Sequence, residues 1–544
     1  MIVFRVFSTP NSGLGHIVRC QYLAQALQQK GRQVYFIGDV IADQVTSFLN
    51  EVPFAQLYPR TPEQWDAKRD AQATLALIEK EHLHPDWVVV DHYYLGAAWE
   101  TQLIQSGFRV MAIDDLVRPH QSQALLDFKW RGSDPEWVYA NKVSPNTQLL
   151  LGSQYSLISP QLTAQSRLQH PQSSSTEAYT VLLSLGGGGD ALILQQLLAA
   201  LITEFKQDSA SSAFQTIHFQ VVIGPLLKNK ESLTAQFSNQ EWSGCQLTFI
   251  EGKTNLDAEL TKCDLYLGLA GGLVYGLRAV KKPAITFSLS DNQNTDQPLL
   301  DAIGHYFHLN QIHVQDFAKL ARWVRVCQQN PQRIQKLFAF SNVLIDTLGA
   351  SRVADYMISG ILSSLPPITS KNHDWTELAG GRRLRAVEDA DLNHYLASRN
   401  LPENCQNMLD IKPIQPIDHA LWWFNTPRRS FLMTQATGEP LLYIWDELKQ
   451  VDNSHFLIGG WFVCDAQTAF QEAMVALDWQ LKQCAEDYPS VPWVAVISRQ
   501  NKYVKLMNDY FGFKEIEPGG RYYKAVTTLF PKASQQDFYY VYKN

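Results

Sequence analysis

Short apolar runs alternate with longer amphipathic stretches along the first two-thirds of the chain. The mostly apolar run Ile2–Ser8 predicts a buried strand, and the apolar spacing over Leu14–Lys30 predicts a helix that ends at Gly31. Strands with nearly continuous apolar sequence, separated by helices, are typical of a parallel sheet that is covered on both faces. The same pattern predicts three more strands and a helix, at Gln33–Gly38, Trp87–Asp91, Val110–Ile113 and Leu95–Gln105 respectively.

A second series of strands and helices follows a segment rich in Ser, Gln and His, Gln165–Thr176, which we interpret as a linker. Leu365–Asn372 contains a Pro pair and polar residues and predicts a second linker. The sequence therefore predicts an α/β protein with doubly wound, Rossmann-like parallel-sheet domains at 1–165 and 177–364, and a further domain at 373–544. The strands of the second series are expected at Thr180–Leu185, Ile217–Val222, Leu247–Ile250, Leu265–Leu267 and Ala284–Phe287.

Composition narrows the class of protein. A chain of 544 residues is too long for a single domain with one hydrophobic core. Its content of 45% apolar and 18% charged residues is typical of a globular protein. The net charge of −7, without any basic stripe, argues against nucleic acid as a partner. Seven scattered cysteines without a CxxC pair indicate reduced thiols and a cytoplasmic location, with no metal site. We expect neither a signal peptide nor a membrane span, because no apolar stretch is long enough.

The turn Ser12–His16 lies between the first predicted strand and helix. Its residues Gly13, Leu14 and Gly15 allow a ligand to approach the backbone closely, and a helix N-terminus offers free amides to phosphate. His16 would then lie at the carboxyl edge of the sheet, where it can act as a general base or bind a phosphate oxygen. The alternative is an ordinary helix start with an incidental histidine.

Polar residues also follow other predicted strands. Asp91, His92 and Tyr93 come directly after an apolar strand and fit the rim of an active site, although Asp91 could equally cap the next helix. Asp114 and Asp115 follow the next strand and either orient a histidine or a substrate hydroxyl, or form a solvated turn.

Three more polar or glycine-rich turns follow strands of the second series. Backbone amides in the first two can hold phosphate, and the third offers amide side chains to sugar hydroxyls. Each turn alone is a weak signal, but their repetition at successive strand ends of one sheet is a stronger one. The candidate phosphate-binding residues are Gly186, Gly187, Gly271 and Gly272, and the candidate sugar-binding residues are Asn292 and Gln293.

The order of motifs resembles that of the UDP-sugar hydrolases of the pseudaminic acid pathway. The motifs are, in order, GLGHIVRCQYLAQAL, VVVDHYYLGAAWE, AIDDLVRPH, SLGGGGD, AGGLVYGL and DNQ. The resemblance covers roughly residues 1–350. It implies a GT-B fold, like that of the MurG-type glycosyltransferases, and removal of UDP from a 2,4-diacetamido-2,4,6-trideoxyhexose with inversion. His16 matches that family's catalytic histidine, which positions or deprotonates water. Asp91, His92 and Tyr93 match its strand-end trio, and no metal or other cofactor is implied.

Two positions differ from that family. An acid that holds the ribose is replaced by Gly276, and an arginine is replaced by Ser159. Loss of the ribose-binding acid would weaken UDP binding or change the nucleotide donor, and so it bears on hydrolysis itself.

Residues 382–544 resemble GNAT acetyltransferases through RLRAVEDADL, SRN, DHALWWF and RQNKYVKLMNDYFGF. The resemblance implies an α+β fold and acetyl-CoA as a cofactor. The stretch VCDAQTAFQEAMVAL, where this family binds the coenzyme A diphosphate, has no glycine, and Asn508 replaces the tyrosine that often acts as general acid. We therefore expect weak binding of acetyl-CoA, and a recognition or dimerisation role is an alternative.

Three functions remain open from the sequence. The first is hydrolysis of a UDP-linked diamino sugar. The second is a GT-B glycosyltransferase that moves a nonulosonic acid from a CMP-sugar to flagellin or a polysaccharide. The third is a binding protein for nucleotide sugars that has lost catalysis.

Overall fold

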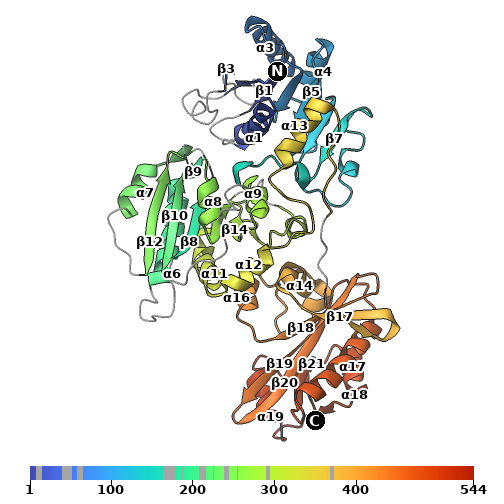
Figure 1. Ribbon diagram of the computed structural model, residues 1–544. Coiled ribbons are helices and arrows are strands. Elements are labelled where there is room, and N and C mark those ends of the chain that lie inside the picture. Colours follow the sequence, from blue (N-terminus) through green and yellow to red (C-terminus); the bar gives the residue numbers. More distant parts are fainter. Residues whose placement is uncertain are drawn as a thin grey trace. The chain divides into compact units, whose positions relative to one another are not determined.

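The computed structural model describes residues 1–7, 15–39, 52–57, 65–162, 178–186, 188–206, 216–224, 226–237, 244–253, 255–289, 295–367 and 373–544 (Figure 1). The chain forms two compact units, Met1–Thr369 and Ser370–Asn544. The first unit contains two large parallel sheets, and the second contains one mixed sheet.

The first sheet is parallel throughout and has the strand order β3-β2-β1-β4-β5-β6-β7. Alternate strand residues face opposite sides, because successive side chains of a strand point to opposite faces. Phe4 and Val89 pack toward α1 (Gly15–Gln29) and α13 (Gly349–Ser359), whereas Val3 and Val88 pack toward α3 (Ala67–Lys80) and α4 (Ala97–Gln105). The strands are β1 (Ile2–Val6), β2 (Val34–Gly38), β3 (Phe54–Gln56), β4 (Trp87–Asp91), β5 (Val110–Ile113), β6 (Ala124–Asp127) and β7 (Gln148–Leu151).

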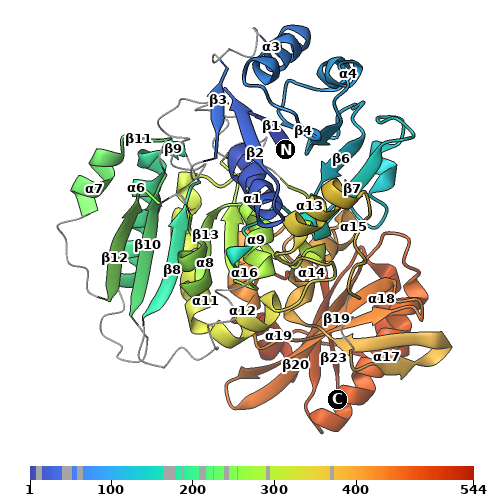
Figure 2. The ribbon, with the colours of Figure 1, turned by 45° about the horizontal axis from the view of Figure 1, so that its top comes forward.

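The second sheet is also parallel, with the order β12-β10-β8-β13-β14-β15, and Figure 2 shows β12, β10 and β8 side by side. Its strands are β8 (Tyr179–Ser184), β10 (Ile217–Ile223), β12 (Cys245–Glu251), β13 (Leu265–Leu269), β14 (Ala284–Phe287) and β15 (Phe307–Leu309). Its helices are α6 (Ala191–Lys206), α7 (Lys230–Phe237), α8 (Asp257–Lys262), α9 (Leu273–Ala279), α10 (Gln297–Ala302), α11 (Phe317–Gln329) and α12 (Pro331–Phe338).

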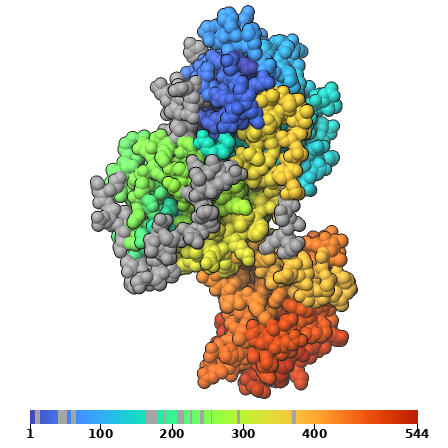
Figure 3. All heavy atoms as spheres, in the orientation of Figure 1, coloured from blue at the N-terminus to red at the C-terminus, as the bar shows by residue number. Residues whose placement is uncertain are grey.

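Helix α13 follows the second sheet in sequence but packs on the first. Val353 and Ala354 belong to the same core as Leu23 of α1, and Trp87 Nε1 donates a hydrogen bond of 2.9 Å to the carbonyl of Met357. The yellow atoms of this helix lie beside the blue N-terminal elements in Figure 3. The chain thus returns to its first sheet after completing the second.

The second unit contains a mixed sheet of order β16-β17-β18-β19-β20-β21-β23-β22. Its pairs are antiparallel except β20 with β21, which pair in parallel at Leu457 and Trp493. The strands are β16 (Thr376–Leu378), β17 (Arg382–Ala386), β18 (Arg429–Thr434), β19 (Pro440–Val451), β20 (Ser454–Val463), β21 (Trp493–Ser498), β22 (Lys514–Glu515) and β23 (Phe538–Lys543). The helices are α14 (Leu392–Arg399), α15 (Pro402–Cys405), α16 (Pro416–Trp423), α17 (Phe470–Asp487), α18 (Lys502–Tyr510) and α19 (Tyr523–Leu529).

These three sheets confirm the predicted fold class, an α/β protein with a pair of Rossmann-like parallel sheets followed by an α+β unit. Strands β4, β5 and β14 have the bounds expected from their apolar runs. The loop expected over 184–190 is different, because Gly188–Asp190 forms a short strand, β9, that pairs with β11 (Leu226–Lys228).

Candidate active site

His16 and Asp91 meet at the point where the strand order of the first sheet reverses. Strand β1 is followed in the chain by α1 and then by β2 on one side, whereas β4 pairs with β1 on the other side. His16 lies in the first turn of α1, and Asp91 is the last residue of β4. Ligands of open α/β sheets bind in the crevice outside such a reversal, at the carboxyl ends of the strands.

An ionised Asp91 joins His16 to Arg19. Asp91 Oδ1 lies 2.6 Å from His16 Nδ1, and Arg19 donates to both carboxylate oxygens, over 2.6 Å from Nε and 2.5 Å from Nη2. Burial alone would raise the pKa of the Asp91 carboxyl, but Arg19 and His16 together hold it well below its ordinary value. Asp91 is therefore charged at neutral pH and only accepts hydrogen bonds.

The charge on Asp91 determines which nitrogen of His16 carries the proton. Arg19 Nη2 also lies 3.1 Å from His16 Nδ1, but a guanidinium only donates, so Nδ1 cannot accept from it while donating to Asp91. A protonated Nδ1 facing the carboxylate satisfies Asp91 and leaves the lone pair on Nε2. Nε2 makes no hydrogen bond within the described part of the chain. His16 is thus arranged as a general base whose orientation is held by an acid.

Aromatic rings enclose the imidazole of His16. The Tyr93 ring lies edge-on at 4.4 Å between centroids, and the Phe7 ring lies edge-on at 5.7 Å. Burial raises the pKa of the Tyr93 phenol to about 12, with Asp115 adding to the effect, so Tyr93 keeps its proton and can donate a hydrogen bond. The site therefore combines one base with one neutral donor.

His92 occupies a different environment from His16. Its Nδ1 accepts from the backbone N–H of Tyr94 over 3.1 Å, and its Nε2 lies 3.4 Å from Asp39 Oδ2. Burial lowers the pKa of His92 to about 4, so the ring is neutral at physiological pH. Asp39 in turn pairs with Arg5, a fully buried arginine near the end of β1. The structure thus brings His92 close to the site, with Nδ1 in a hydrogen bond and Nε2 buried near Asp39 without one.

A network of buried acids extends from the site behind β5. Asp115 accepts from Arg19 Nη1 over 3.1 Å, whereas Asp114 faces the other way and accepts from Arg118 and from Tyr139. His120 lies behind Asp114, with its Nε2 3.6 Å from the Asp114 carboxylate.

The far side of His120 is held by Glu100 of α4. His120 Nδ1 lies 2.6 Å from Glu100 Oε1. Although burial alone would lower it, the two carboxylates raise the pKa of His120 to about 9, so the ring is cationic at neutral pH. Sequence reasoning missed the role of Arg19, although its position three residues after His16 places both on one face of the helix.

The second sheet presents glycines at its own reversal of strand order, between β8 and β13. Gly186 follows β8 with a φ of +81°, and Gly271 follows β13 with a φ of +46°. A Cβ added at Gly186, Gly271 or Gly272 would meet no atom within 4 Å, so space remains around these turns. Gly15 is the first residue of α1. The predicted residues Gly13, Leu14, Gly187, Asn292 and Gln293 lie outside the described residues.

The two departures from the hydrolase pattern lie close to one another. A Cβ at Gly276 would lie 3.6 Å from the Leu162 side chain, so an acid there would point at apolar groups. Ser159 is buried and donates a short hydrogen bond to Asp257 of α8. Burial raises the pKa of Asp257 despite this bond.

The start of α17 (Phe470–Asp487) lacks the glycine turn that the GNAT pattern uses for the diphosphate of coenzyme A. Helix α17 begins after Ala469, which has no side chain to cap it, and its first turn carries the anionic Glu472, paired with Arg382. A negative charge in this turn opposes binding of a second anion. Asn508 is buried and donates to the carbonyl of Val504 in its own helix, so it does not face a substrate as an acid would.

No helix in the described ranges is long and apolar enough to cross a membrane. In the same part of the chain, no group of three or more His, Cys, Asp or Glu side chains could hold a metal ion.

No protein-family model and no curated protein sequence matches the chain. Several solved structures are similar to it. UDP-GlcNAc 2-epimerase from Neisseria meningitidis, bound to UDP-GlcNAc, is 14% identical with a TM-score of 0.43, over 66% of this chain and 100% of that one. MurG from Acinetobacter baumannii is 14% identical with a TM-score of 0.42, over 66% of this chain and 99% of that one. A putative phosphinothricin N-acetyltransferase is 19% identical with a TM-score of 0.25, over 30% of this chain and 98% of that one.

Proposed function

We propose that the first unit is a nucleotide-sugar hydrolase that releases UDP from a UDP-linked 2,4-diacetamido-2,4,6-trideoxyhexose with inversion at the anomeric carbon. The observation that carries this proposal is the pair His16–Asp91, in which an ionised acid fixes Nδ1–H and leaves Nε2 as the base. The motif order of the sequence supports the choice of substrate.

The reaction needs one proton transfer and one bond exchange. A water molecule gives a proton to His16 Nε2 while its oxygen bonds to the anomeric carbon from the face opposite the diphosphate. The bond between the anomeric carbon and the diphosphate oxygen breaks, and its electron pair leaves with UDP. Asp91 stabilises the imidazolium that forms, as the orienting acid does in other acid–histidine pairs.

The remaining candidate residues serve binding in this proposal. The diphosphate is bound by backbone N–H groups, which stabilise developing negative charge without a metal. These N–H groups belong to the glycine turns with Gly13, Leu14, Gly15, Gly186, Gly187, Gly271 and Gly272. Tyr93 donates to the sugar or the water, and Asn292 and Gln293 contact the sugar. His92 positions the Tyr93–Tyr94 segment, since its Nδ1 accepts from Tyr94.

Release of UDP from the UDP-sugar in water tests the proposal. The His16→Ala variant is expected to lose at least about 100-fold in turnover, the usual scale for a lost acid–base group. His84→Ala is the matched control, because His84 is exposed and makes none of the contacts described for the site. Turnover of His16→Ala close to that of the parent chain would remove His16 from the mechanism.

The second candidate is a glycosyltransferase that uses a CMP-linked nonulosonic acid and an acceptor on flagellin or a polysaccharide. It is kept because the ribose-binding acid of the hydrolase pattern is absent at Gly276, which leaves the donor open. The same base would then deprotonate an acceptor hydroxyl instead of water. Turnover with CMP-sugar and acceptor, and none with UDP-sugar and water, would select this candidate.

For the second unit we propose a recognition role without acetyl transfer. Glu472 in the first turn of α17 and the engagement of Asn508 within its own helix support this proposal. Acetyl-CoA is therefore not assigned as a cofactor.

A further inference from the structure

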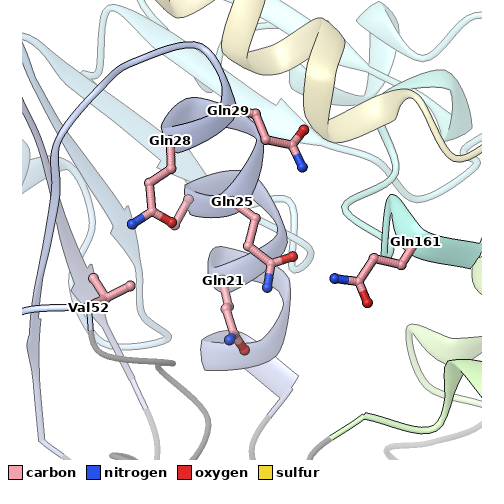
Figure 4. Close-up of a pocket in the computed structure, with 7 residues that line it drawn as sticks. Gln21, Gln25, Gln28, Gln29, Val52 and Gln161 are labelled. Atoms are coloured by element: carbon pink, nitrogen blue, oxygen red, sulfur yellow. The ribbon is translucent and has the colours of Figure 1, made fainter.

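Helix α1 carries a row of glutamines on the side away from the proposed catalytic residues. Gln21, Gln25 and Gln28 are spaced by four and three residues and so share one helix face, and Gln29 lies beside them. Together with Gln161, they line one pocket of about 280 Å³. Figure 4 shows Gln161 extending toward these side chains from a separate segment of the chain.

The side-chain amides in this pocket have no partners within the described ranges. None of the five makes a side-chain hydrogen bond there. Gln21 is the most telling, since only 8% of it is exposed and yet its amide is unpaired. The Gln21 amide is open to the pocket rather than sealed from solvent, so it can hydrogen-bond to a ligand in place of water.

The side chains that line the pocket indicate which kind of ligand it can bind. Each amide offers an acceptor oxygen and two N–H donors, which match hydroxyl and acetamido groups that also donate and accept. No charged side chain lines the pocket in the described part of the chain, so nothing there would compensate a phosphate or a carboxylate. Ala24 and Val52 add an apolar surface for the C–H face of a ring.

We propose that this pocket binds a neutral saccharide and is separate from the proposed catalytic site. Its volume lies just below the range of roughly 300–1,000 Å³ that is usual for small-molecule sites, so one or two sugar rings are the expected size. His16, Arg19 and Cys20 lie on the face of α1 that meets Asp91, whereas the glutamines lie on the other face. The inference goes beyond the proposed hydrolysis and does not depend on it.

Calorimetric titration of the full chain with the neutral disaccharide N,N′-diacetylchitobiose tests the pocket. We expect saturable binding with a dissociation constant of roughly 1 mM or below. Gln25→Leu and Gln21→Leu, which keep the side-chain volume, are each expected to weaken it about fivefold, the scale of one hydrogen bond. Gln105→Leu, at an exposed position at the end of α4, is the matched control and should leave the affinity unchanged.

Three results would overturn the proposal. One is the absence of saturable binding, and another is binding that neither Gln25→Leu nor Gln21→Leu weakens in a chain that still folds by circular dichroism. The third is equal binding of glucose 6-phosphate or of a triglutamine peptide through the same two residues, which would exclude a site for neutral saccharides. Disaccharide binding should survive His16→Ala, so failure of the hydrolase proposal and failure of this one can be told apart.

Discussion

Asp91 Oδ1 lies 2.6 Å from His16 Nδ1, on the opposite side of the ring from the nitrogen that would receive a proton. The distance joins the last residue of β4 to the first turn of α1, two elements that are 75 residues apart in sequence. Each consequence of this pairing can be tested separately.

Replacing Asp91 by Asn should remove the charge that selects the tautomer of His16. An amide can accept or donate, so Nδ1–H is no longer enforced and the base is lost in part of the molecules. We expect turnover to fall about 10²–10⁴-fold with little change in the Michaelis constant. Asp134→Asn, at an exposed carboxylate, is the control. A folded Asp91→Asn variant with parental turnover would show that Asp91 does not orient the base.

Arg19→Met should change the pH dependence of activity. Arg19 opposes the effect of burial on Asp91, so its removal lets the pKa of that carboxyl rise. Activity that needs an ionised Asp91 is then lost at a higher pH, and the acid limb of the pH–rate profile moves upward. Arg322→Met, at an exposed arginine of α11, serves as control. The idea fails if the folded variant keeps the parental acid limb.

His120 should make the first unit less stable at alkaline pH. Its pKa of about 9 lies above the ordinary value near 6.5, so its stabilisation is complete below pH 6.5 and is lost as pH rises through 9. The loss should approach roughly 3 kcal/mol, since each pKa unit corresponds to about 1.4 kcal/mol. Denaturant unfolding between pH 6.5 and 9.5 measures it.

In the His120→Gln variant this pH dependence should disappear, because an amide does not titrate. His84→Gln, at an exposed histidine, should keep the parental slope. The same slope in His120→Gln and in the parent chain would mean that His120 is not charged in the folded protein.

Acetyl-CoA should not bind measurably to the full chain at micromolar concentration. Glu472 in the first turn of α17 opposes the diphosphate, and no glycine lets the backbone approach it closely. Isothermal titration gives the answer directly. Saturable micromolar binding would return acetyl transfer to the functions of the second unit.

The sequence predicted those parts of the fold that local pattern determines. Apolar runs gave the bounds of β4, β5 and β14, because parallel strands buried on both faces read as continuous apolar sequence. The return of α13 to the first sheet could not be predicted in this way, since only packing between distant segments brings Val353 into the same core as Leu23. The pairing of β9 with β11 was hidden for the same reason.

In the candidate site, too, the sequence predicted what a local pattern marks and missed what depends on contacts between distant residues. A glycine turn marked His16 and a strand end marked Asp91 as separate candidates, and the structure places the two in contact. The different environments of His16 and His92 depend on burial and on Asp39, neither of which has a signature in sequence. Arg19 was overlooked because a single arginine on a helix carries no pattern until its partner is known.

The most direct test of the account is hydrolysis of the UDP-sugar in water enriched in ¹⁸O. Mass spectrometry of the products should show ¹⁸O on the anomeric carbon of the released sugar and none in UDP, and His16→Ala should abolish the labelled sugar. If ¹⁸O appears in UDP, or if the folded chain releases no UDP, then a water activated by His16 does not attack the anomeric carbon.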